Sequence, residues 1–171
     1  IAFNHYKDAV KLLQKNKEYP EREKTLYRIY EKAAHFNSAV WVDARTCFNW
    51  LRTAIDYYEE VKNRDKIFEL SMAYIAASTV KGNYKRSRTT IQNLINRIEI
   101  REGSLEWAML FGAGVCLVDW YQGLHRDCLR HAQKSIRILE SKPDNLNNET
   151  YPAYAWALFW EQKALAYTGR P

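Results

Sequence analysis

The sequence has few of the residues that break helices. Its 171 residues include only six glycines and four prolines, about half the share that these two residues have in average proteins. An all-β protein needs a turn about every eight to twelve residues. The scarcity of turn-forming residues therefore favours long helices over a fold built from short strands.

Signals for secretion and for membrane insertion are also absent from the sequence. The three cysteines, Cys47, Cys116 and Cys128, are an odd number without Cys-x-x-Cys spacing, which is typical of reduced intracellular thiols. Charged residues interrupt the first twenty positions, so no signal peptide is expected. The longest uncharged stretch near the middle, residues 107–118, is too short to cross a bilayer. We expect an intracellular protein, cytoplasmic or nuclear, without a membrane partner.

Basic and aromatic residues are plentiful. The sequence has 26 Lys and Arg against 20 Asp and Glu, which gives a formal net charge of +6. It also holds six Trp, twelve Tyr and six Phe. Large rings fill wide spaces between helices and also form binding surfaces. The rings therefore suit either an aromatic core or an aromatic binding site.

Apolar residues recur at helical spacing through almost the whole sequence. About eight helices are expected, at residues 6–13, 26–33, 41–55, 67–77, 84–98, 105–122, 126–141 and 152–168. The fourth, sixth and eighth are apolar on nearly all sides, whereas the fifth and seventh are amphipathic. A helix that is apolar all round must be covered on several sides. The alternation predicts an all-α fold of stacked hairpins, each with an inner and an outer helix.

Two segments of the sequence repeat one pattern of turn and helix residues. The copies are Gly82-Asn83-Tyr84…Ser87…Ile91 and Gly123-Leu124-His125…Cys128…Ala132. The turn glycines are 41 positions apart, and Gly169 follows 46 positions later. This pattern resembles the tetratricopeptide repeat (TPR) in a variant with long helices, because each TPR hairpin has a glycine at its turn, then an aromatic residue and then Ala. The resemblance covers residues 65–171 and implies a right-handed α-solenoid of antiparallel helix hairpins that binds other proteins in its inner groove.

A second resemblance concerns the first third of the chain. Tyr30-Glu31-Lys32-Ala33 followed by Trp41 is similar to one half-a-TPR repeat, a motif of RNA-processing factors. We expect residues 1–171 to form a single TPR-like helical repeat domain. The hairpin order leaves the first and last helices without partners, which suggests part of a longer array. The alternative is a terminal cap, but residues 153–160 lack the polar outer face that a cap needs.

Four aromatic residues are candidates for a partner-binding groove. They are Trp120, Tyr121, Trp156 and Trp160. The repeat register places Trp120 and Tyr121 on the side of the hairpin that the TPR family uses to hold peptides, and the other two lie on the last helix. Exposed rings are common anchors in protein interfaces. The alternative for each ring is packing in the core.

Eight cations are candidates for a basic surface. They are Lys81, Lys85, Arg86 and Arg88 before and in the fifth helix, and Arg126, Arg130, Lys134 and Arg137 on one side of the seventh. If the two outer helices adjoin, this surface could hold the phosphates of a nucleic acid or an acidic protein segment. The alternative is a solvated face that keeps the protein soluble.

Gly112-Ala113-Gly114 lies inside the sixth expected helix. Each glycine in a helix interior costs about 1 kcal/mol relative to Ala, so another interaction must compensate for that cost. The first interpretation is a close approach of a neighbouring helix. The second is a ligand pressed against the bare backbone, although no glycine-rich phosphate loop is present.

No set of residues forms a recognisable catalytic or metal site. His125, Cys128 and His131 share a helix side, so a pair of them could contact one zinc ion, but no second ligand cluster accompanies them. The cysteines lie in apolar helical settings that suit inert thiols. We expect no enzyme activity, no cofactor and no metal.

These observations predict a scaffold for protein–protein interactions, which binds a peptide or a partner protein, with acidic character, on the solenoid surface. One alternative is binding of RNA or DNA through the basic outer helices. Another is a ligand-sensing repeat segment of a larger signalling protein or transcription regulator.

Overall fold

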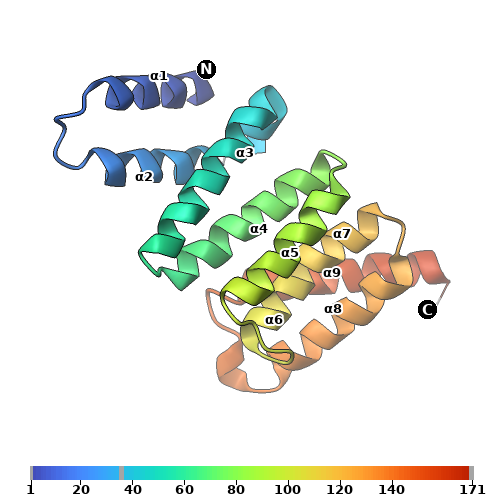
Figure 1. Cartoon of the computed structure of the whole chain (residues 1–171). Helices are drawn as coiled ribbons and strands as arrows, with labels where there is room; N and C mark the ends of the chain where they lie inside the picture. The colour runs from blue at the N-terminus through green and yellow to red at the C-terminus, as the bar shows by residue number, and fades with distance from the viewer. Residues whose placement is uncertain (1, 35–36, 170–171) are drawn as a thin grey trace. The chain divides into compact units, whose positions relative to one another are not determined.

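The computed structural model describes residues 2–34 and 37–169, and all the regular secondary structure in this part of the chain is helical (Figure 1). The expectation of an all-α chain is confirmed. The first four helices are α1 (Ala2–Lys15), α2 (Arg22–Ala34), α3 (Asn37–Glu60) and α4 (Arg64–Val80). The following elements are α5 (Tyr84–Arg97), α6 (Leu105–Met109), η1 (Leu110–Val115), α7 (Cys116–Tyr121), α8 (His125–Glu140), η2 (Pro143–Asn145) and α9 (Tyr151–Thr168).

The observed helices lie where the sequence predicts them. The elements α6, η1 and α7 form one continuous helix, which corresponds to the expected helix over 105–122. The loop predicted over 142–150 contains only the short 3₁₀ turn η2. The chain divides into two compact units, residues 1–77 and 78–171. The stacking of all hairpins into one right-handed solenoid, within a single domain of residues 1–171, stays a prediction.

Aromatic rings fill the space between the helices of the first unit. Helix α2 packs against both α1 and α3. Phe3, Ala33 and Cys47 are buried together, and Trp50 packs against them. The Trp50 ring is 5.3 Å from the ring of Tyr30, in a stacked arrangement. These large rings are therefore part of the core in this unit.

Helix α3 contains a kink at Asp43. The backbone of Asp43 leaves helical geometry (φ −151°, ψ 73°). Its carboxylate accepts hydrogen bonds from the backbone N–H of Thr46 at 3.0 Å and from the ammonium of Lys7 at 2.5 Å. Asp43 thus caps the second part of α3. The side chain of Trp41 lies outside the described residues, so the half-a-TPR resemblance stays a prediction.

The two turns that the sequence aligns have the same backbone geometry. Gly82 and Gly123 both adopt left-handed conformations, with φ of 74° and 75°. In each turn two backbone N–H groups bond back to the preceding helix, and the donor–acceptor pairs are Gly82–Thr79, Asn83–Ser78, Gly123–Trp120 and Leu124–Asp119. This is the Schellman motif, in which glycine meets no steric penalty. The local repeat over 41 positions is therefore present in the backbone as well as in the sequence.

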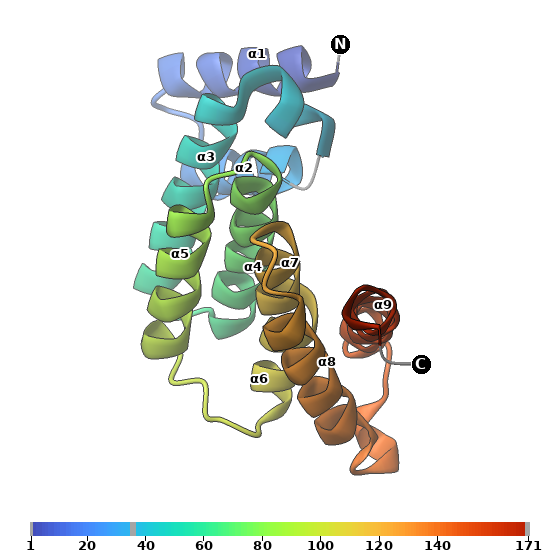
Figure 2. The ribbon, with the colours of Figure 1, turned by 90° about the vertical axis from the view of Figure 1, so that its right-hand side faces the viewer.

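In the second unit α8 packs against α9 and against the continuous helix α6–η1–α7 (Figures 1 and 2). A buried cluster joins α7, α8 and α9, with members Cys116, Cys128, Leu129, Ala132, Trp160 and Ala164. Small residues in this cluster permit close helix packing. Gly112, four residues before Cys116, extends this close packing one turn towards the start of the continuous helix.

The close approach expected at the central glycines is present at Gly112. A Cβ atom on Gly112 would lie 3.1 Å from the Cβ of Ala157 and 3.3 Å from both the Ala153 carbonyl oxygen and the Ser135 Cβ. Helices α8 and α9 therefore contact the bare backbone of η1. The helix is also wider here, because the N–H of Cys116 bonds to the carbonyl of Phe111, five residues back.

We expect Gly112→Ala to destabilise the protein by about 1–3 kcal/mol, although alanine alone favours a helix, because the added methyl overpacks the contact. Chemical denaturation measures this change. Adding Ala157→Gly removes the nearest contacting atom, so the double variant should lose less stability than the sum of the two single variants. A Gly112→Ala protein that is more stable than the wild type would contradict the close approach.

Candidate functional site

Six rings of the second unit form a connected group, which we call the aromatic array. Its members are Trp120, His125, Trp156, Phe159, Trp160 and Tyr167. They come from α7, the first residue of α8, and α9. The Trp120 and Trp160 rings are 5.8 Å apart, and the Trp156 and Trp160 rings are stacked at the same distance. Tyr167 meets Trp120 edge-on at 5.0 Å.

The aromatic array has a buried base and an exposed edge. Trp160 is only 4 % exposed, whereas Trp156 is 50 % exposed, and Phe159 and Tyr167 are also exposed. Among the described residues, no hydrogen-bond partner exists for the buried indole N–H of Trp160. The exposed Trp156 ring stacks on the buried Trp160 ring, whose position is fixed by packing.

Lys163 adds a positive charge to the aromatic array. Its ammonium lies 5.5 Å from the centre of the Trp120 ring and 5.1 Å from that of Phe159. Both separations are within the range of cation–π attraction. The ammonium is thus held over the rings, where an acidic group of a partner can reach it.

Three of the four predicted groove residues belong to the aromatic array. Trp120, Trp156 and Trp160 are in contact, but Tyr121 lies outside it: it is 48 % exposed and takes part in none of the described ring contacts. Phe159 and Tyr167 are not among the groove residues predicted from the sequence. Phe159 follows Trp156 by three positions and Tyr167 follows Lys163 by four. These spacings could have placed the two rings on the same helix side.

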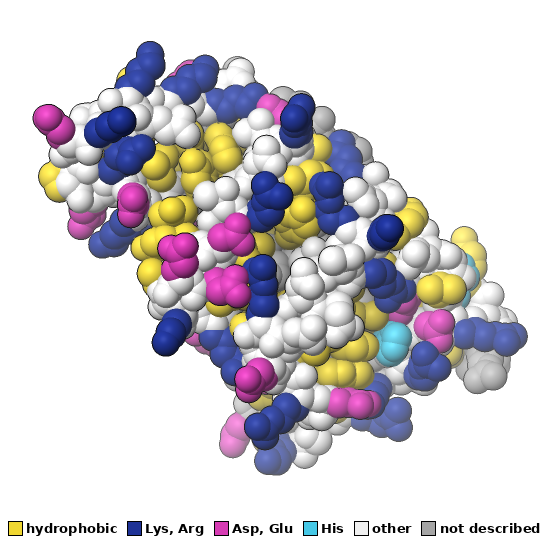
Figure 3. Space-filling model, viewed as in Figure 1, with side chains coloured by type: hydrophobic (Ala, Val, Ile, Leu, Met, Phe, Trp, Pro, Cys, Tyr) yellow, Lys and Arg dark blue, Asp and Glu magenta, His cyan; other side chains and the backbone are white. Residues whose placement is uncertain are grey.

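The predicted basic surface is divided among several separate environments. Arg130 pairs with Asp127 at 2.7 Å. Lys134 pairs with Glu102 and lies 4.7 Å from the Trp107 ring centre. Lys81, Lys85 and Arg86 are exposed around the turn between α4 and α5. On the face seen in Figure 3, Lys and Arg side chains alternate with Asp, Glu and apolar residues.

Among the eight predicted surface cations, Arg88 differs most from a solvated residue, because its guanidinium forms an ion pair with a buried carboxylate. Asp119 is 1 % exposed and accepts a hydrogen bond from the Arg88 guanidinium. Nδ1 of His131 lies 2.7 Å from the other Asp119 oxygen. The side-chain oxygen of Gln122 also accepts from Arg88, at 2.9 Å. This junction, formed by Arg88, Asp119, Gln122 and His131, connects α5, α7 and α8.

Asp119 is not among the residues predicted from the sequence, although the sequence contains a signal for it. Asp119 is the one charged residue in the otherwise apolar run from 107 to 120. A buried carboxylate requires ion pairs or hydrogen bonds. The apolar neighbours of Asp119 in the sequence therefore predict that its carboxylate has ion-pair or hydrogen-bond partners. The linear sequence does not reveal that one of them is Arg88, 31 positions earlier.

The three residues considered for zinc have different partners in the structure. His131 contacts Asp119, His125 lies in the aromatic array, and the thiol of Cys128 donates to the carbonyl of Cys116 at 3.5 Å. Within residues 2–34 and 37–169, no group of three His, Cys, Asp or Glu side chains is placed to hold a metal ion.

The three cysteine thiols are free and buried. Burial raises the pKa of Cys47 to about 11. The pKa of Cys116 is raised well above its usual range by its hydrogen bond with Cys128 and by burial. The thiolate is the nucleophilic form of cysteine, and raising the pKa disfavours it.

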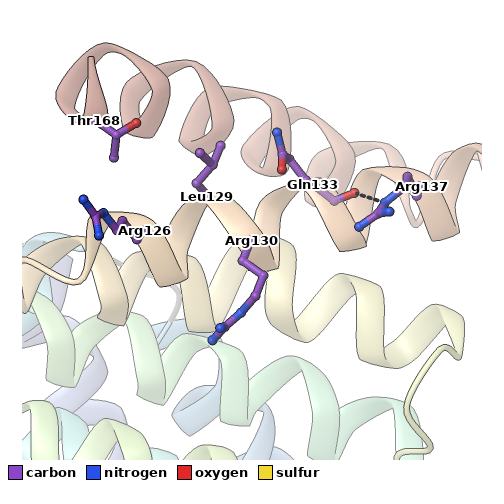
Figure 4. A pocket seen from close by; sticks show the side chains of 6 residues that line it. All are labelled: Arg126, Leu129, Arg130, Gln133, Arg137 and Thr168. Carbon is purple, nitrogen blue, oxygen red and sulfur yellow. Dashed lines mark hydrogen bonds between the residues drawn. The ribbon is translucent and has the colours of Figure 1, made fainter. Parts of the chain in front are cut away.

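A pocket of about 210 Å³ lies between α8 and the end of α9 (Figure 4). Its lining residues are Arg126, Leu129, Arg130, Gln133, Arg137 and Thr168, and we call it the arginine pocket. Arg126, Leu129, Gln133 and Arg137 recur every three or four positions along α8, so they share one helix side. The Arg130 side chain is directed away from α9 (Figure 4). The pocket retains three members of the predicted basic surface, and Lys134 is not among them.

Comparison of the chain with family models, with curated proteins and with solved structures found no match. Among the residues that the structure describes, none of the helices combines the length and the apolar character needed to cross a membrane.

We expect all three thiols to react slowly with a thiol-specific aromatic disulfide reagent at mildly alkaline pH, because each is buried. Absorbance of the released product measures the rate. Unfolding in concentrated guanidinium should make all three react rapidly. A thiol that reacts at the rate of free cysteine in the folded protein would contradict this account.

Replacing Asp119 tests the buried junction. Asp119→Ala leaves Arg88 and His131 without their shared acceptor, and we expect a loss of about 2–4 kcal/mol in unfolding free energy. The matched control is Asp127→Ala, which removes the exposed pair with Arg130 and should cost less than about 1 kcal/mol. Equal losses for the two variants in chemical denaturation would refute a special role for the junction.

Proposed function

We propose that residues 78–171 form a protein-binding module, which holds a peptide or a partner helix against the aromatic array. The observation that carries this proposal is the exposed edge of the array above its buried base. Trp156 is half-exposed while the adjoining Trp160 is buried, so the exposed rings are presented by a rigid support. Rigid aromatic side chains lose little conformational entropy when a partner covers them.

The energetic gain from covering the array is large enough for specific binding. Removing about 100 Å² of apolar surface from water contributes roughly 2.5 kcal/mol. Trp156, Phe159 and Tyr167 each expose a large part of their rings. A partner that covers all three therefore gains several kcal/mol, against the cost of association.

The chemistry of the array specifies a partner segment with an apolar anchor beside an acidic residue. The apolar side chain would cover the exposed edge formed by Trp156 and Phe159. The acidic side chain would pair with the ammonium of Lys163, which already lies over the rings of Trp120 and Phe159. Charge complementarity of this kind fixes the orientation of a partner and speeds its association.

Nucleic-acid binding through the outer helices has less support. Arg88, Arg130 and Lys134 contact carboxylates within the chain, so their charges are already partly neutralised. Each phosphate contact that is lost reduces the electrostatic affinity for nucleic acid. The ligand-sensing alternative stays a prediction, and no specific contact in the described residues favours it.

The variants Trp156→Ala and Tyr121→Ala distinguish specific binding on the aromatic array from non-specific binding to exposed rings. Binders are first selected from a display library of random peptides on the wild-type protein. We expect Trp156→Ala to weaken the selected peptides by about ten-fold or more, whereas Tyr121→Ala changes their affinity by less than about two-fold. Fluorescence polarisation of labelled peptides measures both affinities.

Tyr121 is a matched control because it is almost as exposed as Trp156, but lies outside the array. Peptides enriched in an aromatic or large aliphatic residue next to Asp or Glu would support the proposal. A selection without binders, or binders that tolerate Trp156→Ala, would overturn it.

A further inference from the structure

The outward side of α9 is apolar along the length of the helix. The elements α6, η1, α7 and α8 pack against α9, and in Figure 2, where α9 is seen nearly end-on, they lie to its left. Away from these elements, exposed residues recur at helical spacing, and they include Ala155, Trp156, Phe159, Lys163, Ala166 and Tyr167. Within α9, which the structure describes in full, Lys163 is the one exposed residue with a charge. A helix that is apolar on all sides is expected to be covered on several of them.

Two alanines mark points where a partner can approach α9 closely. Ala155 and Ala166 are both exposed, and their side chains project less than the neighbouring rings of Trp156, Phe159 and Tyr167. Eleven positions make about three turns of an α-helix, so the two alanines share one helix side and lie about 16.5 Å apart. Large and small side chains that alternate along one side allow a second helix to interlock with the first.

The polarity of this side favours a helical segment over an extended one. An extended segment laid along α9 loses the water bound to its backbone N–H and C=O groups, and each group left unpaired costs free energy. The exposed polar groups of α9 are few: the side chains of Gln162 and Lys163 and the hydroxyls of Tyr151 and Tyr167. They are too few to pair an extended backbone over three turns, whereas a helix pairs its own backbone groups internally.

We propose that the partner of the aromatic array is an amphipathic helix, which lies along α9 from Ala155 to Ala166. This inference rests on the proposed function and adds the form of the partner. Apolar side chains on one side of the partner helix cover the rings of Trp156 and Phe159 and continue to Ala166. An acidic side chain between them pairs with the ammonium of Lys163. A second copy of this chain fits less well, because its own exposed side brings another Lys163 and no acid.

Two displayed peptide libraries test the form of the partner, with the full chain as the target. In the first library, variable positions occupy one side of an alanine-rich helix of about 20 residues, which is long enough to cover the exposed side of α9. In the second, the same positions vary, but interior prolines prevent a helix. We expect the first library to yield the tighter binders. Binders of equal or higher affinity from the second library would refute the helical partner and leave the proposed function in place. Two libraries without binders would refute both proposals.

Substitutions on α9 locate the bound helix. Ala166→Gln places a long side chain at the second point of close approach, and we expect it to weaken the selected peptides by about five-fold or more in fluorescence polarisation. Trp156 is about 15 Å away along the helix, so a short segment bound only at Trp156 would tolerate this change. The matched control Asn93→Gln adds the same side chain at an exposed position of α5 and should change the affinity by less than about two-fold.

The combination of weaker binding in Trp156→Ala and unchanged binding in Ala166→Gln would overturn the helical partner while the proposed function stands. Analytical ultracentrifugation tests the alternative occupant. A wild-type dimer that both Trp156→Ala and Ala166→Gln dissociate would assign this side of α9 to a second copy of the chain, and would also overturn the proposal.

Discussion

The packing of helices in the second unit depends on the absence of a Cβ atom at Gly112. Because this residue has no Cβ, the Cβ of Ala157 and that of Ser135 can both approach its backbone closely. The contact fixes α9 against η1 and α8. The aromatic array and the arginine pocket both need α9 in this position, since Trp156 and Trp160 belong to the array and Thr168 lines the pocket. One small residue in a helix interior thereby positions two separate surfaces.

The buried junction at Asp119 complements this contact, and the two meet α8 one turn apart, at His131 and Ser135. Arg88, from α5, and His131, from α8, bind the same carboxylate on α7. A cation that the sequence assigns to the surface thus holds helices together, and it is no longer free to attract a partner. Along α8, Arg126, Arg130 and Arg137 are exposed and line the arginine pocket, and Arg130 also pairs with Asp127.

Most helix positions could be predicted from the sequence, because apolar periodicity and turn glycines are local signals. The repeat of the turns at Gly82 and Gly123 was predicted for the same reason. Tyr121, predicted as a groove residue together with Trp120, lies outside the array, and the pairing of Arg88 with Asp119 was not predicted. A step of one residue turns a side chain by about 100° on a helix, so adjacent Trp120 and Tyr121 have different surroundings. Partners of distant ionic groups depend on tertiary packing, which spacing does not encode.

The central claim is that a partner segment binds on the aromatic array. The most direct measurement follows the indole N–H signals of the six tryptophans by NMR while a selected peptide is added. The account predicts that the signals of Trp120, Trp156 and Trp160 shift together, while those of Trp50 and Trp107 stay in place. Shifts confined to Trp50 or Trp107, or no shift at saturation, would contradict it.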